Sequence, residues 1–274
     1  MPSSAPPREL ADGKLLVDRP AEHVARLTIA HPAKRNALDH SILDAITASL
    51  AELAAAGEVR CVIVTGAHGM FSAGYEIGEI TAESFQEEAE SLVAHPFTEA
   101  IEALERFPYP TLAALPGHTI GGGLELALAC DLRVAAEETK LGMPPAKLGL
   151  VYSHTGLRRF LDAIGAARTR ELFLLGSYID ARIALQWGLV NRVAPAAELE
   201  AAALGIASEM AANAPLSQTG NKRVIAALLR AEGDLPEAVE AELIALRRAS
   251  FASHDLREGM SAFAEKRTPR WRGE

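Results

Sequence analysis

The chain has 274 residues, of which 49% are hydrophobic and 23% charged, and its formal net charge is −9. This is the composition of an ordinary globular protein, and the acidic excess argues against nucleic acid or an anionic membrane as a general partner. The first residues lack the long apolar run of a signal peptide, and no stretch has the roughly twenty apolar residues that a membrane span needs. We therefore expect a cytoplasmic protein.

The segment 24–30 alternates between apolar and polar residues before a His-Pro pair, which predicts a strand followed by a loop. Apolar residues at helical spacing predict a helix over 38–56, and Gly57 supplies the stop. The segments 59–65 and 111–115 are typical of strands, and the β-branched run 59–65 is of the type that is buried on both faces. This alternation predicts an α/β architecture.

Residues 78–106 are acidic and carry few strong apolar anchors before Phe97, which predicts a mobile flap that leads into a helix and could cover a ligand. Beyond about residue 155 the periodicity is mainly helical. We therefore expect a core over 1–200 and a helical oligomerisation region over 201–274. Helices rich in alanine and leucine with little sheet of their own often complete their core on a neighbouring subunit, so an oligomer is expected.

The two cysteines, Cys61 and Cys130, both lie in apolar stretches and are expected to be small buried hydrophobes in a reducing compartment. Neither a disulfide framework nor the Cys/His spacing of a metal site is present.

Two glycine-bearing segments are the most informative part of the sequence. Residues 71–77 (FSAGYEI) follow the strand that ends near Thr65, and residues 116–126 (PGHTIGGGLEL) place three glycines between a strand and an apolar helix. Small residues let the backbone approach a ligand, and a helix start presents free N–H groups and the positive end of the helix dipole. A glycine triplet alone is equally compatible with a structural turn and does not match the dinucleotide or P-loop motifs.

Together these segments resemble the crotonase superfamily, also called the enoyl-CoA hydratase/isomerase family, whose members carry an AGxDI-like loop and a GGGxEL-like helix start. The likeness extends from about Leu27 to Arg267. It implies an α/β fold in which a ClpP-like spiral of ββα units is closed by a C-terminal helical trimerisation region. A homotrimer or homohexamer that binds an acyl-CoA is also implied; coenzyme A is then part of the substrate, and no separate cofactor or metal is expected.

The same likeness implies that the backbone N–H groups of Tyr75 and Gly122 form an oxyanion hole for the thioester oxygen. Two fixed donors would stabilise the enolate, and loss of one such donor typically costs on the order of 10² to 10³ in rate. The alternative is that both loops are only tight turns. The substrate-binding positions that the likeness implies, including one in the terminal EKR, are Arg35, Ala37, Ala73, Gly74, Ile77, Gly121 and Lys266.

Glu125 lies on an otherwise apolar stretch, so it should face the site or have a buried partner. In hydratases of this family the matching glutamate is one of two that activate water, and the second position is occupied here by Pro145. Proline cannot transfer a proton, so hydration by two glutamates is not available in its usual form. Isomerisation, which depends chiefly on the missing glutamate, is disfavoured further.

Decarboxylation of a malonyl-type thioester needs fewer acid–base groups, because loss of CO2 generates the enolate without a base. Residues 149–156 (GLVYSHTG) resemble the methylmalonyl-CoA decarboxylase branch, which has a tyrosine at the position of Tyr152 and a histidine where this chain has Tyr75. We expect Tyr152 or His154 to orient the departing carboxylate or to deliver the proton, with Glu125 holding a water or the donor. The alternatives are a packed core tyrosine and a helix-capping or surface histidine.

Three alternative functions each require a different feature of the sequence. A serine protease of the ClpP type, for which Ser72, Ser153 and His154 are candidates, would need a serine directly after the glycines, and none is there. RNA association would need a basic face. Within the enzyme class the alternative is a single-glutamate hydratase or other lyase acting through Glu125, with Glu76 or Glu79 as candidates to replace the missing glutamate.

Overall fold

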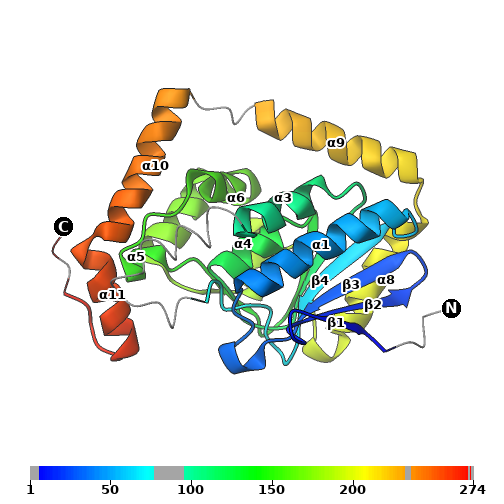
Figure 1. Ribbon diagram of the computed structural model, residues 1–274, viewed down its shortest axis with the longest axis horizontal. Helices are drawn as coiled ribbons and strands as arrows, with labels where there is room; N and C mark the ends of the chain where they lie inside the picture. The colour runs from blue at the N-terminus through cyan, green and yellow to red at the C-terminus, as the bar shows by residue number, and fades with distance from the viewer. Residues whose placement is uncertain (1–5, 77–95, 232–235, 271, 273–274) are drawn as a thin grey trace.

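The structure is a computed structural model that describes residues 6–76, 96–231, 236–270 and 272 (Figure 1). Its main element is a seven-stranded sheet in the order β1-β2-β3-β4-β5-β7-β10. The pairs β1-β2 and β2-β3 are antiparallel, and the pairs from β3 to β10 are parallel. The strands span Arg8–Leu10 (β1), Leu15–Ala21 (β2), Val24–Ile29 (β3), Cys61–Gly66 (β4), Thr111–Leu115 (β5), Leu132–Ala136 (β7) and Arg192–Ala194 (β10).

Helices cover both faces of this sheet (Figure 1). On β4, Val62 and Val64 belong to the larger core, while Cys61 and Ile63 alternate with them and face the other way, as a strand's two-residue period requires. The larger core includes α1 (His40–Ala56), α3 (Thr98–Arg106) and α4 (Gly122–Leu128), and the second face is covered by α8 (Leu199–Ala212). The predictions of an α/β architecture and of a strand buried on both faces are confirmed.

Local chemistry sets the ends of α1. The Asp39 carboxylate caps the helix by accepting a hydrogen bond from the Ile42 N–H at 2.8 Å, and Gly57 ends it with a φ of 68°. The helix therefore begins two residues after the predicted start at Leu38. Sequence periodicity did not indicate β2, because Pro20 lies where its register with β3 is irregular.

A small second sheet supports the start of α4. It consists of β6 (Thr119–Ile120), β8 (Lys140–Gly142) and β9 (Ile179–Asp180), in the order β6-β8-β9. Because β6 ends directly before Gly121, this sheet fixes where the glycine triplet turns into the helix.

The second half of the chain is mainly helical, as predicted. Its further helices are α5 (Pro145–Leu148), α6 (His154–Leu175), α7 (Ala181–Trp187), α9 (Pro215–Ala231), α10 (Glu237–Ala252) and α11 (His254–Ala264). The predicted boundary at residue 200 falls inside α8, which packs on the sheet, so the helices that extend beyond the sheet unit begin with α9. Two short 3-10 turns span Pro32–Lys34 and Ala196–Glu198.

Of the predicted flap, residues 98–106 form α3, and residues 77–95 lie outside the described part of the chain. Both cysteines are buried, and burial raises the pKa of each thiol to about 12. Among the described residues, no helix combines the length and apolar character needed to cross a bilayer.

Candidate active site

The loop 73–75 is held between two other backbone segments. Leu38 N–H donates to Gly74 O at 2.8 Å, and Glu76 N–H donates to Leu38 O at 3.1 Å, so Tyr75 forms a parallel bridge with Leu38. On the other side, Ile120 N–H donates to Ser72 O at 3.0 Å. Since successive N–H groups of extended backbone point to opposite sides, the Tyr75 N–H points away from Leu38 and has no acceptor among the described residues.

The start of α4 lies directly beside this loop. Gly121 has a φ of 57°, and Gly122 begins the helix, where the first N–H groups have no partner within the helix. A Cβ added to Gly74 would lie 3.2 Å from Gly122 N and 3.0 Å from Ile120 O, and Gly74 itself has a φ of 95°. Glycine is therefore required at position 74 for both its conformation and the close approach. The free N–H groups of Tyr75 and Gly122 are thus brought together.

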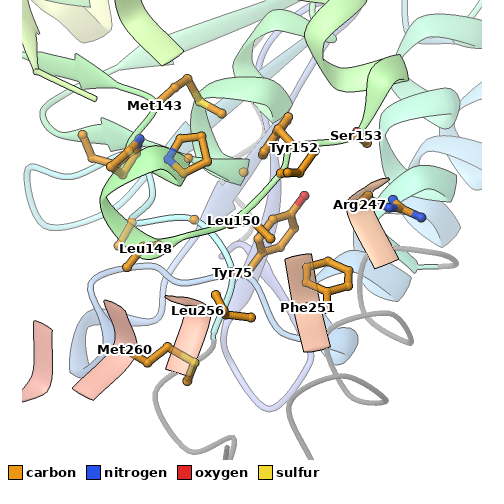
Figure 2. A pocket seen from close by; sticks show the side chains of 18 residues that line it. Tyr75, Met143, Leu148, Leu150, Tyr152, Ser153, Arg247, Phe251, Leu256 and Met260 are labelled. Atoms are coloured by element: carbon orange, nitrogen blue, oxygen red, sulfur yellow. The ribbon is translucent and has the colours of Figure 1, made fainter. Parts of the chain in front are cut away.

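A cavity lies next to these two segments (Figure 2). We call Ala73, Gly74, Tyr75, Gly121 and Gly122 its floor, and Arg247, Phe251, Leu256 and Met260, from α10 and α11, its roof. The wall between floor and roof comes from the following residues: Ile120, Met143, Pro144, Pro145, Leu148, Leu150, Val151, Tyr152 and Ser153. The sheet unit and the C-terminal helices of one chain therefore enclose the same space.

A buried chain of polar side chains starts from the wall. The Tyr152 hydroxyl donates to Glu125 Oε2, and the phenol of Tyr75 lies near enough to both groups for them to affect its pKa. On its other side, Glu125 Oε1 lies 3.2 Å from Arg159 Nη1. Arg159 in turn makes two hydrogen bonds to Glu105, at 2.7 and 3.1 Å. Glu125 does not line the cavity, so it reaches the floor only through Tyr152.

Burial sets the protonation of this chain. It raises the pKa of Glu125, although the Arg159 charge and the Tyr152 hydrogen bond act in the opposite direction. Burial also raises the pKa of Tyr152, and the neighbouring Glu125 charge adds to the effect. Tyr152 therefore remains a neutral phenol at neutral pH, able to donate a hydrogen bond.

Gly156 lets α6 approach this chain. A Cβ there would lie 2.5 Å from Tyr152 Cε1 and 2.9 Å from Glu125 Oε1. Ser153 caps the helix by accepting from Gly156 N–H at 3.1 Å.

The other positions predicted from the sequence do not all lie at the cavity. Ala37 is buried and Arg35 is exposed, and the carbonyl of Arg35 accepts from Ala73 N–H at 3.1 Å, so this loop supports the floor from behind. Lys266 is exposed and does not line the cavity. Ile77 and Glu79 lie outside the described residues.

His154 has a different position from the one expected. It does not line the cavity, and its Nε2 lies 3.3 Å from Glu240 on α10. The role of His154 on the substrate stays a prediction; in the structure its ring lies between α6 and α10.

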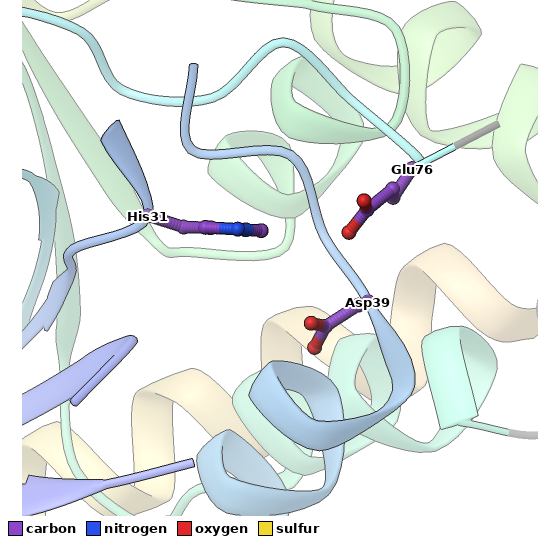
Figure 3. Close-up of side chains that lie close together, drawn as sticks. All are labelled: His31, Asp39 and Glu76. Carbon is purple, nitrogen blue, oxygen red and sulfur yellow. The ribbon is translucent and has the colours of Figure 1, made fainter. Parts of the chain in front are cut away.

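Three side chains near the floor are spaced like metal ligands: His31, Asp39 and Glu76, whose candidate ligand atoms all lie within 4.8 Å of one another (Figure 3). Two ammonium groups already neutralise both carboxylates, with Lys14 at 2.6 Å from Asp39 and Lys34 at 3.1 Å from Glu76. Glu76 is paired with Lys34 and does not line the cavity. We interpret this cluster as part of two ion pairs, one between Lys14 and the cap of α1 and one between the 3-10 turn Pro32–Lys34 and Glu76, which follows the floor residue Tyr75.

Sequence reasoning did not find the roof or the Arg159–Glu105 pair. Arg247 and Phe251 are four residues apart on α10, and this spacing places them on one helix face. No motif distinguishes them from the other helical positions of the second half. Pro145, in contrast, was singled out from the sequence, and it is buried and lines the cavity.

Comparisons with known proteins identify the family. The family model described as enoyl-CoA hydratase/isomerase matches residues 19–274. A probable enoyl-CoA hydratase of Bacillus subtilis is 36% identical over 92% of this chain and 96% of its own length. A 2,3-dehydroadipyl-CoA hydratase of Escherichia coli is 31% identical over 95% of this chain and 99% of its own length.

Solved structures give the same picture at the level of the fold. A methylmalonyl-CoA decarboxylase in complex with 2-nitronate-propionyl-CoA superposes with a TM-score of 0.86 at 28% identity, over 95% of this chain and 99% of that one. An enoyl-CoA hydratase from Bacillus anthracis superposes with a TM-score of 0.73 at 31% identity, over 95% of this chain and 100% of that one. The crotonase-type fold expected from the sequence is confirmed.

Proposed function

The chain belongs to the enoyl-CoA hydratase/isomerase family, and we propose that it decarboxylates a malonyl-type coenzyme A thioester. The observation that carries the proposal concerns the two positions at which a hydratase of this family would have its two glutamates. Pro145 lines the cavity at the position where the resemblance implies a second glutamate, and Glu125 is separated from the cavity by Tyr152. No carboxylate among the described residues lines this cavity, so the site favours a reaction that needs no carboxylate base.

The chemistry follows from the groups that are present. The thioester oxygen would accept hydrogen bonds from the N–H groups of Tyr75 and Gly122. As the bond between the α-carbon and the carboxylate breaks, CO2 leaves and its bonding electrons form the thioester enolate, whose negative oxygen these two donors stabilise. A proton then adds to the α-carbon, so methylmalonyl-CoA and one proton would give propionyl-CoA and CO2.

Tyr152 is the group best placed to handle the carboxylate and the proton. It lines the cavity, and burial together with Glu125 keeps its pKa high, so it stays a neutral donor. Glu125 would act as a positioning residue that fixes the Tyr152 hydroxyl, and Arg159 would hold Glu125 in turn. This assignment also accounts for a carboxylate that is 3% exposed on an apolar helix.

A second candidate, hydration of an enoyl-CoA through Glu125 alone, is favoured by the relatives in sequence, which include the two hydratases named above. It would require a water molecule to reach Glu125 past Tyr152. The two reactions leave different products, so they can be separated directly.

The purified protein is to be incubated with methylmalonyl-CoA and, separately, with crotonyl-CoA, and both acyl-CoA pools followed by mass spectrometry beside a Glu125→Ala variant. Propionyl-CoA from the first substrate is the expected result. Hydroxybutyryl-CoA from the second, absent with Glu125→Ala, would instead establish hydration by a single glutamate and overturn the proposal.

We also propose that the chain assembles as a homotrimer or a homohexamer. What supports this is α9, where Leu216, Val224 and Leu228 are 88%, 58% and 62% exposed in the single chain. Apolar side chains grouped in this way are typical of contact surfaces. Light scattering during gel filtration measures the mass, and a monomer at micromolar concentration would contradict the assembly.

A further inference from the structure

Arg247 is the charged residue of the roof, and among the described residues that line the cavity no other side chain is charged. Its Nε is buried and has no hydrogen-bond partner. Within the described ranges its guanidinium also has no ion pair, whereas Arg159 is paired with Glu105 and Arg267 with Glu258. Among the described residues, the lining of the cavity therefore includes one cation that has no carboxylate partner.

The place of Arg247 in the cavity is equally specific. It lies on α10 one turn before Phe251, and both side chains line the cavity. Burial raises the pKa of the Tyr75 phenol, and the Arg247 charge acts in the opposite direction. Arg247, Tyr75 and Tyr152 thus combine a cation with two neutral phenols at one end of the site.

An unpaired guanidinium beside apolar surface is costly, because it loses hydration without gaining a counter-ion. A ligand carboxylate that entered this end of the cavity would remove that cost and could accept hydrogen bonds from the guanidinium fork. A methyl group in the same place would not remove this free-energy cost. The cavity is therefore suited to discriminate between an acyl group with a second carboxylate and one without.

We propose that Arg247 is the residue that selects acyl-CoA molecules whose acyl group carries a free carboxylate, by pairing with that carboxylate. The inference rests on the proposed function only in taking the cavity as the acyl site. It adds a specificity residue from the C-terminal helices to a floor built by the sheet unit.

The pairing would act on binding more than on bond breaking. During decarboxylation the negative charge leaves the carboxylate for the thioester oxygen, so a cation at the carboxylate interacts more strongly with the substrate than with the transition state. Loss of Arg247 should therefore raise KM for methylmalonyl-CoA without an equal fall in kcat. A group that acted on the transition state would instead lower kcat.

The decisive measurement uses two ligands that cannot react. 2-Carboxypropyl-CoA and isobutyl-CoA are both thioethers, which lack the thioester carbonyl, and they differ by a carboxylate in place of a methyl group. Their dissociation constants are to be measured by calorimetry for the wild type and for Arg247→Gln, Arg247→Lys and Arg248→Gln. The last is a matched control, because Arg248 is exposed and adjacent on the same helix.

The wild type and Arg248→Gln should both prefer the carboxylate ligand. Arg247→Gln should reduce that preference by roughly tenfold to a hundredfold, the range for a hydrogen bond to a charged group. Arg247→Lys should keep part of it, because the charge remains while the planar fork is lost. Circular dichroism and thermal melts establish that each variant is folded.

Two outcomes would overturn the inference: an equal loss of affinity for both ligands in Arg247→Gln, which would place the guanidinium on the coenzyme A portion or in helix packing, and an unchanged preference. Because neither ligand turns over, the result is independent of the proposed reaction. A protein that prefers the carboxylate ligand through Arg247 but releases no CO2 would contradict the decarboxylase proposal alone.

Discussion

The floor of the cavity presents two backbone N–H groups, whereas its roof presents the side chains of α10 and α11. The floor is fixed by backbone hydrogen bonds on both sides of the loop 73–75 and by Gly74, where an added Cβ would lie 3.0 Å from Ile120 O. The roof is fixed by packing: Gly259 on α11 lies against the backbone of Leu148 on α5, and Gly149 lies against that of Asp255.

This difference indicates that the floor and the roof recognise different parts of the substrate. Backbone donors carry no side-chain chemistry, so the floor suits the part of an acyl-CoA that every family substrate shares, the thioester. Side chains differ in charge and shape, so the roof suits the part that varies, the acyl group. Variants of the floor should therefore reduce the rate, and variants of the roof should change affinity and selectivity.

The largest effect is expected from Gly74→Ala. A Cβ at this position would lie 3.2 Å from Gly122 N, and the φ of 95° is strained for alanine, so the two donors would be displaced from each other. We expect kcat to fall on the order of 10² to 10³, as when one oxyanion donor is lost. Gly205→Ala is the matched control, because its Cβ would have no neighbour within 4 Å and its helix should be slightly stabilised. Equal activity of the two variants would contradict a backbone-built floor.

The next effect is expected from Tyr152→Phe. The variant keeps the ring but removes the hydroxyl that connects the cavity to Glu125. A loss of about 10² in kcat is expected for a group that positions or transfers a proton. Tyr178→Phe, at an exposed tyrosine, should leave steady-state rates unchanged. If Tyr152→Phe were fully active, Tyr152 would be a packed core tyrosine, the alternative that the sequence left open.

A smaller effect is expected from the same one-methyl change at Gly259→Ala in α11, the helix that supplies Leu256 and Met260 to the roof. Its Cβ would lie 2.6 Å from Leu148 O, so α11 would have to move away from α5 and carry Leu256 and Met260 with it. We expect KM to rise by about tenfold, corresponding to about 1.4 kcal/mol of binding free energy, with kcat little changed. Steady-state kinetics on one acyl-CoA test this, and a fall in kcat as large as that of Gly74→Ala would remove the distinction between floor and roof.

The smallest effect is the contribution of Glu125 to the pH dependence of the free energy of unfolding. This side chain does not line the cavity. Burial raises the pKa of Glu125 above its ordinary value of 4.5, so the folded protein binds this proton more tightly than the unfolded chain does. The contribution of this carboxyl to the free energy of unfolding therefore falls as pH rises through that raised pKa. Urea unfolding of the wild type and Glu125→Gln at several pH values measures it: the stability of the wild type relative to the variant should decline with rising pH. A difference independent of pH would show that the pKa is not raised.

The sequence predicted the elements whose residues carry strong local patterns. The strands β4 and β5 and the helix α1 follow from β-branched runs, helical spacing and a terminal glycine, all of which act over a few residues. The strand β2, with Pro20 at its irregular register, has no such pattern and is held by its neighbours β1 and β3. The helices α10 and α11 were expected as helices, but not as part of the site.

For the site, the sequence by itself determined the glycine segments, the isolated Glu125 and the proline at position 145, because each of these is unusual for its local context. Only the tertiary structure decided that Tyr152 stands between Glu125 and the cavity, that His154 faces Glu240, and that Arg247 belongs to the roof. The physical reason is range. Backbone conformation and burial are encoded within a few residues, whereas bringing Tyr75 and Arg247 into the lining of one cavity depends on how the whole chain packs.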